Sequence, residues 1–199
     1  DAAQLVRTDL DDVAAAPIVT PPSGLAEFTK AITDADSKDQ SQYDAALAFC
    51  NTHPSSPISI RVYRDLVRNL GDQTLSAEKI QDFARNYLKA AAYWGERMET
   101  VSRFQLGWTL CRYEEFADLG LKYVREAGAK MTAAKKKDLA QAFENAHQLA
   151  ETAQAHKAAR EIHAAIKQGK AEDGLAKLKA LHAAHSFDPI IKYLYAEAA

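Results

Sequence analysis

The residues of this sequence that could carry out chemistry are mainly histidines, which gather in its C-terminal third. They are His147, His156, His163, His182 and His185. His182 and His185 are three residues apart, so on one helix they share a face. A zinc site needs three or four converging ligands, and no His-Glu-x-x-His or Cys-x-x-Cys pattern supplies them. We therefore expect surface or partly buried histidines and no bound metal. The alternative that would use them is a helical metal-dependent hydrolase.

Other reactive side chains lack the patterns that catalysis requires. The sequence contains no Gly-x-Ser-x-Gly nucleophile motif and no glycine-rich phosphate loop. The carboxylate pairs Glu114-Glu115 and Glu172-Asp173 fall at expected helix starts, where negative charge interacts favourably with the helix dipole. The run Lys135-Lys136-Lys137 is interpreted as a solvated basic face rather than a phosphate site. The sequence thus predicts no catalytic residue, no cofactor and no enzyme activity.

Composition favours a folded protein without a nucleic-acid or membrane surface. Of 199 residues, 47% are hydrophobic and 26% are charged, which is ordinary for a globular chain. This length forms one domain, or two small ones that share a helical core. The net charge of −2 argues against a general nucleic-acid or anionic-membrane partner. No run of eighteen apolar residues exists to form a membrane span.

The first residue and the cysteines bear on the compartment. The sequence begins at Asp1, which suggests a removed signal peptide and an extracytoplasmic or periplasmic protein. A truncated chain or a cleaved tag would also explain this start, and a cytoplasmic protein is the alternative. Cys50 and Cys111 lie in apolar helical segments, where we expect free buried thiols.

The elements that must position these residues are predicted to be helices. Glycine and proline are sparse, and the alternation of Val, Ile and Thr that strands need is rare. Residues 1–22 are expected to form an extended arm that is acidic and then proline-rich. Residues 23–199 are expected to form a single helical domain, with a possible division near 128–132. Capping residues and glycines place the expected helices after Ser23, over 43–50, from Pro57, after Ser76, over 96–110, over 113–127, over 132–168, and as two more that follow Gly169.

The longest of these segments carries an apolar stripe whose phase steps near Ala153. The stripe reads Leu139, Phe143, Ala146, Ala150 and Ala153, and then resumes as Ala155, Ala159, Ile162 and Ile166. Such a step indicates either a tight break near Ala153 or one long helix that is slightly unwound.

One strip of the sequence, Leu106-Gly107-Trp108-Thr109-Leu110 followed by Tyr113-Glu114-Glu115, resembles a tetratricopeptide repeat. Leu106 and Gly107 fill the Leu-Gly pair of that family's first helix, and Tyr113 opens the second. The strip departs from the pattern at Arg103, at Phe116 and in a shortened turn. The segments 43–47 and 168–175 are similar to the opening of a second helix. The resemblance implies antiparallel helical hairpins in an α-solenoid, with an irregular helical bundle as the alternative.

The resemblance also implies a function and a place for it. Repeat scaffolds of this kind bind a protein or peptide partner without catalysis. Phe104 and Trp108 take positions that line the concave groove in this family, and the neighbouring aromatics are Tyr93, Trp94 and Tyr113. In a groove these side chains would anchor a partner, whereas buried they would fill the core. An alternative is an accessory helical domain of a larger extracytoplasmic protein, such as a thioredoxin-like one.

Overall fold

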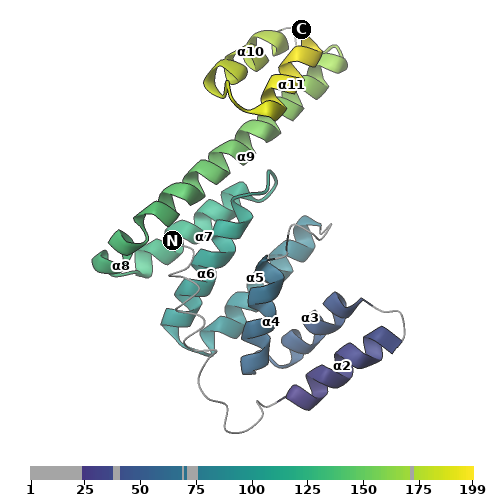
Figure 1. Ribbon diagram of the computed structural model, residues 1–199, viewed down its shortest axis with the longest axis vertical. Coiled ribbons are helices and arrows are strands. Elements are labelled where there is room, and N and C mark those ends of the chain that lie inside the picture. The colour runs from purple at the N-terminus through teal and green to yellow at the C-terminus, as the bar shows by residue number, and fades with distance from the viewer. Residues whose placement is uncertain (1–23, 38–40, 69, 71–75, 171–172) are drawn as a thin grey trace.

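The computed structural model describes residues 24–37, 41–68, 70, 76–170 and 173–199, and these residues form an all-α fold without strands. The predicted arm, residues 1–22, lies outside the described residues. The helices are α2 (Leu25–Ser37), α3 (Gln42–Thr52), α4 (Pro57–Arg68), α5 (Ala77–Ala92), α6 (Glu96–Leu110), α7 (Ala117–Lys130), α8 (Ala133–Asp138), α9 (Ala140–Lys167), α10 (Gly174–Ala184) and α11 (Pro189–Ala198), labelled in Figure 1. The prediction of an all-α class is confirmed.

Four helix starts follow from local side-chain hydrogen bonds. Ser41, Ser76 and Thr132 each accept a bond from the backbone N–H three residues later, and so cap α3, α5 and α8. Asp188 caps α11 in the same way, and Pro189 stands at the start of that helix. A capping oxygen satisfies a backbone donor that the helix itself leaves unpaired. These boundaries were predictable because each depends on residues next to one another in the chain.

Two predicted boundaries around α7 are wrong. The helix begins at Ala117 rather than at Tyr113, because residues 111–116 form turns. It also continues past Gly128 to Lys130. Gly128 is buried inside the helix, where its missing side chain leaves room for the Phe143 ring of α9, 3.0 Å from the place a Cβ atom would occupy. The glycine serves helix packing here and does not end the helix.

The expected helix over 132–168 is broken at one end and continuous in the middle. Leu139 separates α8 from α9 with φ −98° and ψ 8°, and its side chain is fully buried. Around Ala153, in contrast, α9 continues without a break over 28 residues. The buried leucine fixes the corner, because its side chain is held in the core while the backbone changes direction.

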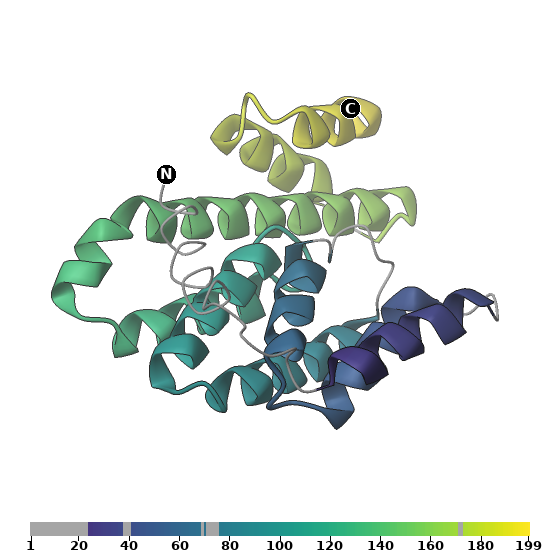
Figure 2. The same ribbon diagram turned by 60° about the horizontal axis from the view of Figure 1, so that its bottom comes forward.

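The phase step near Ala153 reflects two hydrophobic clusters on opposite sides of α9. Ala146, Ala150 and Ala153 belong to a large cluster with α3 to α7. Ala155 and Ala159 belong to a smaller cluster with α10 and α11. Residues two positions apart lie on nearly opposite faces of a helix. Figures 1 and 2 accordingly show α9 between the body of the protein and the α10–α11 pair.

Helices α6 and α7 approach each other closely through two glycines. A Cβ atom on Gly107 would lie 2.7 Å from the carbonyl oxygen of Gly120. A Cβ atom on Gly120 would lie 2.6 Å from the backbone nitrogen of Cys111. The two helices therefore pack backbone against backbone. Gly120 is the small residue that faces Gly107. Phe116 lies outside α7, as the residue just before its first turn.

Arg103 bridges the same helix pair. Its guanidinium pairs with Glu99 of α6 at 2.7 Å and with Glu126 of α7. It also lies over the Tyr123 ring, 5.6 Å from the centroid. The hydrogen bond from Arg103 is the main reason that the pKa of Glu99 is lowered. Because the Arg103 side chain is only 18% exposed, this ion pair is screened less than a surface pair.

We expect Gly120→Ala to lower the free energy of unfolding by about 2 kcal/mol, because the new methyl group would overlap backbone atoms that cannot move independently. Gly128→Ala on the same helix is the matched control. Its methyl group would meet the Phe143 ring, which can shift, and alanine is favoured over glycine in a helix by up to about 1 kcal/mol. Urea unfolding followed by circular dichroism measures both variants. Equal losses in the two would contradict the close backbone contact.

Candidate functional site

A hollow of about 510 Å³ lies between the end of α6 and the middle of α9. We call it the Trp108 hollow. Its lining residues are Trp108, Arg112, Asn145, Gln148, Leu149, Thr152, Ala153 and His156. The hollow therefore combines an indole, a cation, two amides, a hydroxyl, an imidazole and two aliphatic side chains. Aromatic residues and Arg are enriched in protein interfaces, and small-molecule sites also combine apolar walls with a few polar groups.

The aromatic wall of the hollow is Trp108 with Arg112 against it. The guanidinium carbon of Arg112 lies 4.1 Å from the centre of the indole ring. A cation in that position is attracted by the ring, by about 0.5–1 kcal/mol at an exposed site. The two residues are four apart, so they would share a helix face, although Arg112 itself lies just past the end of α6. Trp108 is half-buried, so this stack holds an accessible indole in a fixed orientation.

The opposite wall is supplied by one face of α9. Asn145 and Gln148 present amides, and Leu149 and Ala153 present apolar groups. The Asn145 oxygen accepts a bond from Gln141, and the Gln148 amide nitrogen donates to Glu144. These two hydrogen bonds use the Asn145 oxygen and the Gln148 nitrogen, and leave the other polar atom of each amide out of the contact. An amide side chain can both donate to and accept from a peptide backbone.

The far end of the hollow is closed by His156, which links three segments. Its Nε2 atom lies 2.7 Å from a carboxylate oxygen of Asp188, the residue that caps α11. Its Nδ1 atom lies 4.0 Å from Glu114, in the turn after α6. Arg160 of α9 pairs with the same Glu114 oxygen at 3.1 Å. These contacts tie the α6–α7 turn, α9 and α11 together at the boundary between the two hydrophobic clusters.

The Asp188 carboxylate is held in its charged form. Partial burial disfavours that form, but hydrogen bonds from the Ile191 backbone and from His156, with others, outweigh it and lower the pKa of Asp188. Both ring nitrogens of His156 thus face carboxylates, at 2.7 Å and 4.0 Å. These contacts orient the His156 ring and hold the first turn of α11 in place.

The five aromatic residues predicted to line a groove are not brought together. Phe104 is 2% exposed and packs edge-on against Phe143 of α9, so it belongs to the core. Tyr93 and Trp94, 59% and 39% exposed, lie in the turn before α6. Trp108 is at the other end of that helix, about 20 Å away by the rise of 1.5 Å per residue. Tyr113 is half-buried in the turn that follows.

The other residues that could carry out chemistry make packing and polar contacts within the fold. His182 stacks on the Tyr195 ring, 5.1 Å between centroids, and His163 lies 3.2 Å from Glu197. Among the residues that the structure describes, no group of three or more His, Cys, Asp or Glu is placed to hold a metal ion. Cys50 and Cys111 are free and buried, as predicted. Burial raises the pKa of the Cys111 thiol to about 11 and that of Cys50 to about 12.

The sequence indicated Trp108 but not the α9 side of the hollow. Asn145, Gln148 and Leu149 follow Trp108 by more than thirty residues, and no motif connects them to it. Their polar and apolar types fit an ordinary amphipathic helix, so nothing in the pattern distinguishes them from a solvated surface. Only the packing of α7 and then α9 against α6 brings them opposite the indole.

Comparison with known proteins provides no relative. No family model matches the chain, and neither does any curated protein or solved structure. Within the described parts of the chain, none of the helices has the length and apolar character needed to cross a lipid bilayer.

We predict that the free energy of unfolding of Asp188→Asn changes less with pH in the acid range than that of the parent. Because folding lowers the pKa of Asp188, its charge stabilises the fold above the unfolded pKa of about 3.9. That contribution is lost as the pH falls through the folded pKa. Asparagine still caps the helix but does not titrate. Urea unfolding measures the free energy of unfolding at neutral pH and near pH 3. The parent should be the more stable protein at neutral pH, and its advantage over the variant should be smaller near pH 3.

The control for this experiment is Asp188→Ala, which also removes the cap of α11. At neutral pH its free energy of unfolding should be about 1 kcal/mol lower than that of the asparagine variant. If the parent and Asp188→Asn differed by the same amount at both pH values, the carboxylate would not be charged and partnered as described.

Proposed function

We propose that this protein is a non-catalytic, tetratricopeptide-like helical scaffold that binds a peptide segment of a partner protein in the Trp108 hollow. The observation that carries the proposal is the combination of a half-buried, oriented indole with hydrogen-bonding amides across from it. The indole offers a large, rigid anchoring surface, and the amides can pair with an extended backbone. The partner segment would place an apolar side chain between Trp108 and Leu149.

The helix packing supports the scaffold part of the proposal. Helices that are neighbours in the sequence also pack against each other, as in the pairs α2 with α3, α5 with α6, and α6 with α7. The close contact of Gly107 with Gly120 resembles the small-residue contact within a tetratricopeptide hairpin. Such scaffolds keep a recognition surface rigid, which reduces the entropy lost on binding.

The charge of the hollow favours a partner with an acidic group near its anchor. Arg112 is exposed at the rim and carries the positive charge closest to the indole. The carboxylates Glu114 and Asp188 at the far end are already paired with Arg160 and His156. A peptide with an aliphatic or aromatic residue followed by Asp or Glu would therefore match the hollow best.

The test selects peptides from a displayed library against the full chain and measures their binding by Trp108 fluorescence. The chain has two tryptophans, so Trp94→Phe leaves Trp108 as the reporter. Gln148→Arg, which places a long charged side chain in the hollow, should weaken binding at least about tenfold, or 1.4 kcal/mol. Circular dichroism confirms that the variant is folded.

The matched control is His147→Arg, which introduces the same side chain one residue earlier. His147 is exposed on α9 and does not line the hollow. Binding to this variant should equal that of the parent. Equal weakening in both variants, or peptide binding without any change in Trp108 fluorescence, would contradict the proposed site.

A further inference from the structure

The loop between α10 and α11 contains a phenylalanine whose side chain is left in water. Phe187 is 100% exposed, the highest value among the large hydrophobic residues that the structure describes. It directly precedes Asp188, the residue that caps α11. A hydrophobic residue just before a cap often packs on the fourth residue of the helix. That residue is Lys192, which is charged and exposed, so the Phe187 ring has no local partner.

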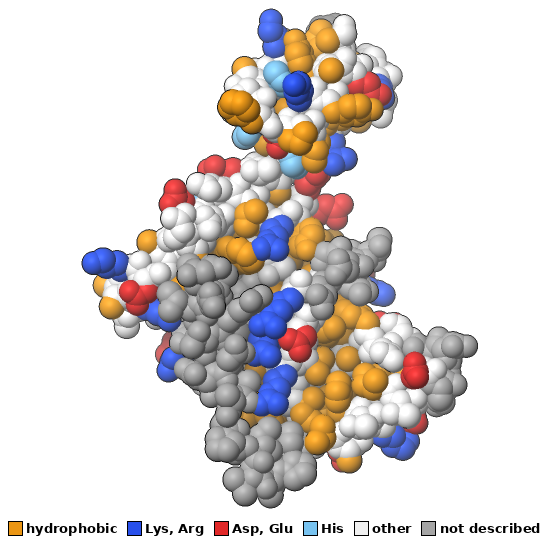
Figure 3. Space-filling model, viewed as in Figure 1, with side chains coloured by type: hydrophobic (Ala, Val, Ile, Leu, Met, Phe, Trp, Pro, Cys, Tyr) orange, Lys and Arg blue, Asp and Glu red, His pale blue; other side chains and the backbone are white. Residues whose placement is uncertain are grey.

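The surface around this ring is apolar and carries little charge. Ala183 and Ala184, at the end of α10, are exposed. The segment 183–187 contains no Asp, Glu, Lys or Arg. In Figure 3 the α10–α11 pair, at the top of the view, shows apolar side chains over its surface beside Lys and His side chains. The loop therefore forms an uncharged apolar projection.

This projection lies beside the far end of the Trp108 hollow. Asp188 follows Phe187 in the chain, and its carboxylate lies 2.7 Å from the Nε2 atom of His156, which lines the hollow. The ring is thus one residue away from a group that contacts the wall of the hollow. Because the ring is fully exposed, it does not occupy the hollow of its own chain.

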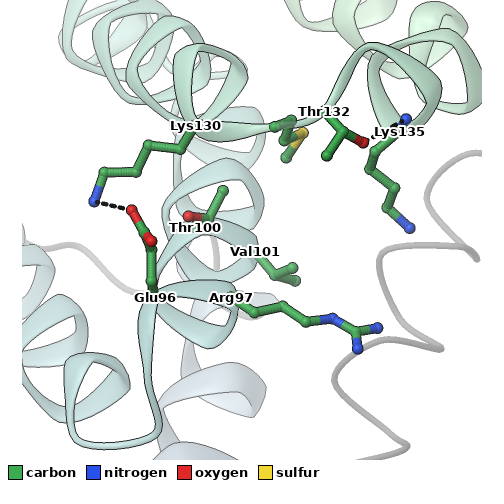
Figure 4. A pocket seen from close by; sticks show the side chains of 8 residues that line it. Glu96, Arg97, Thr100, Val101, Lys130, Thr132 and Lys135 are labelled. Carbon is green, nitrogen blue, oxygen red and sulfur yellow. Dashed lines mark hydrogen bonds and ion pairs between the residues drawn. The ribbon is translucent and has the colours of Figure 1, made fainter.

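A second hollow, of about 400 Å³, is a poorer match for an aromatic ring. It lies at the opposite end of α6, and Figure 4 shows Glu96, Arg97, Lys130 and Lys135 around it. Lys130 lies 3.8 Å from Glu96 and 3.3 Å from Glu99. Arg97 and Lys135 also have interaction partners. A ring placed there would take charged groups out of water without giving them new partners, which costs free energy.

We propose that Phe187 of one chain occupies the Trp108 hollow of a second copy, and that the contact is reciprocal. The contact uses the hollow of the proposed function, between Trp108 and Leu149, and therefore rests on that function. Its volume of about 510 Å³ lies within the range of ligand pockets, about 300–1,000 Å³, so it admits a phenyl ring. The uncharged loop brings no positive group against Arg112 at the rim.

The closeness of ring and hollow favours a closed pair of chains over a polymer. When a projection and its receptor lie next to each other on one molecule, a two-fold axis between them lets both contacts form at once. An aromatic side chain buries about 150–250 Å². Two rings, each against a wall of similar area, bury about 600–1,000 Å² in total. A standard interface buries about 1,200–2,000 Å², so the dimer is weak and reversible.

Such a dimer regulates the binding of a partner. A hollow filled by the ring of a second copy cannot accept a peptide, so the two occupants compete. A peptide that binds only the free hollow shifts the equilibrium to the monomer by mass action.

Sedimentation equilibrium of the full chain tests the dimer. We expect a reversible monomer–dimer equilibrium for the parent. Phe187→Ser should raise the dissociation constant of the dimer at least about tenfold, because the ring is lost from both contacts. Tyr193→Ser is the matched control, since Tyr193 is another exposed aromatic residue of α11, and it should leave the constant unchanged. Circular dichroism confirms that both variants are folded.

The hollow is tested from its own side by Gln148→Arg, with His147→Arg as the control. Gln148→Arg should weaken the dimer as Phe187→Ser does, whereas His147→Arg should not. A mixture of Phe187→Ser with Gln148→Arg combines one open hollow with one ring. Heterodimers should therefore form more tightly than either variant pairs with itself. A mixture that associates no more than its two components would overturn the contact.

The outcomes separate this contact from the proposed function. A parent that stays monomeric up to about 1 mM, or a dimer that persists in Phe187→Ser, would overturn the contact and leave peptide binding in the hollow unaffected. A peptide that binds the hollow without dissociating the dimer would also overturn it. If no library peptide binds while Phe187→Ser and Gln148→Arg both abolish the dimer, the proposed partner is wrong and the contact between copies is supported.

Discussion

The backbone contact between Gly107 and Gly120 is the constraint on which the rest of the structure depends. With no side chain on either residue, α6 and α7 approach until an added Cβ atom would lie 2.6–2.7 Å from backbone atoms of the partner helix. Helix α7 in turn packs against α9, and α9 carries α10 and α11. Any wider spacing of the first pair would move α9 away from Trp108 and open the hollow between them.

Helix α9 converts that local contact into the arrangement of the whole chain. It presents alanines to both hydrophobic clusters, on opposite faces, so two sets of helices can pack closely on one rod. The boundary between the clusters is where the polar contacts of His156, Asp188 and Glu114 lie. The Trp108 hollow ends at this boundary. A ligand there would touch the joint between the two parts as well as the indole.

Local rules predicted the helices well and failed where distant packing decides a boundary. The caps at Ser76, Thr132 and Asp188 were readable because a side chain bonds to a backbone amide two or three residues away. Gly128 has the residue type of a helix end, yet it is buried in α7 against a ring from another helix. Leu139 has the type of a helix interior, yet burial of its side chain fixes a corner.

By itself the sequence determined the all-α class and the helix starts that are capped at Ser76, Thr132 and Asp188, because these depend on periodicity and on neighbouring residues. It could not decide between core and groove for the aromatics. Phe104 and Trp108 are four residues apart and share a helix face, so their pattern is the same. Only the tertiary structure separates them: α9 covers Phe104 with Phe143 and, one turn later, leaves Trp108 beside an open hollow lined by amides. The difference depends on which side chains of α9 lie opposite each residue. The position of α9 is set by its packing on α7, and that of α7 by its packing on α6, so the local sequence of α6 does not reveal it.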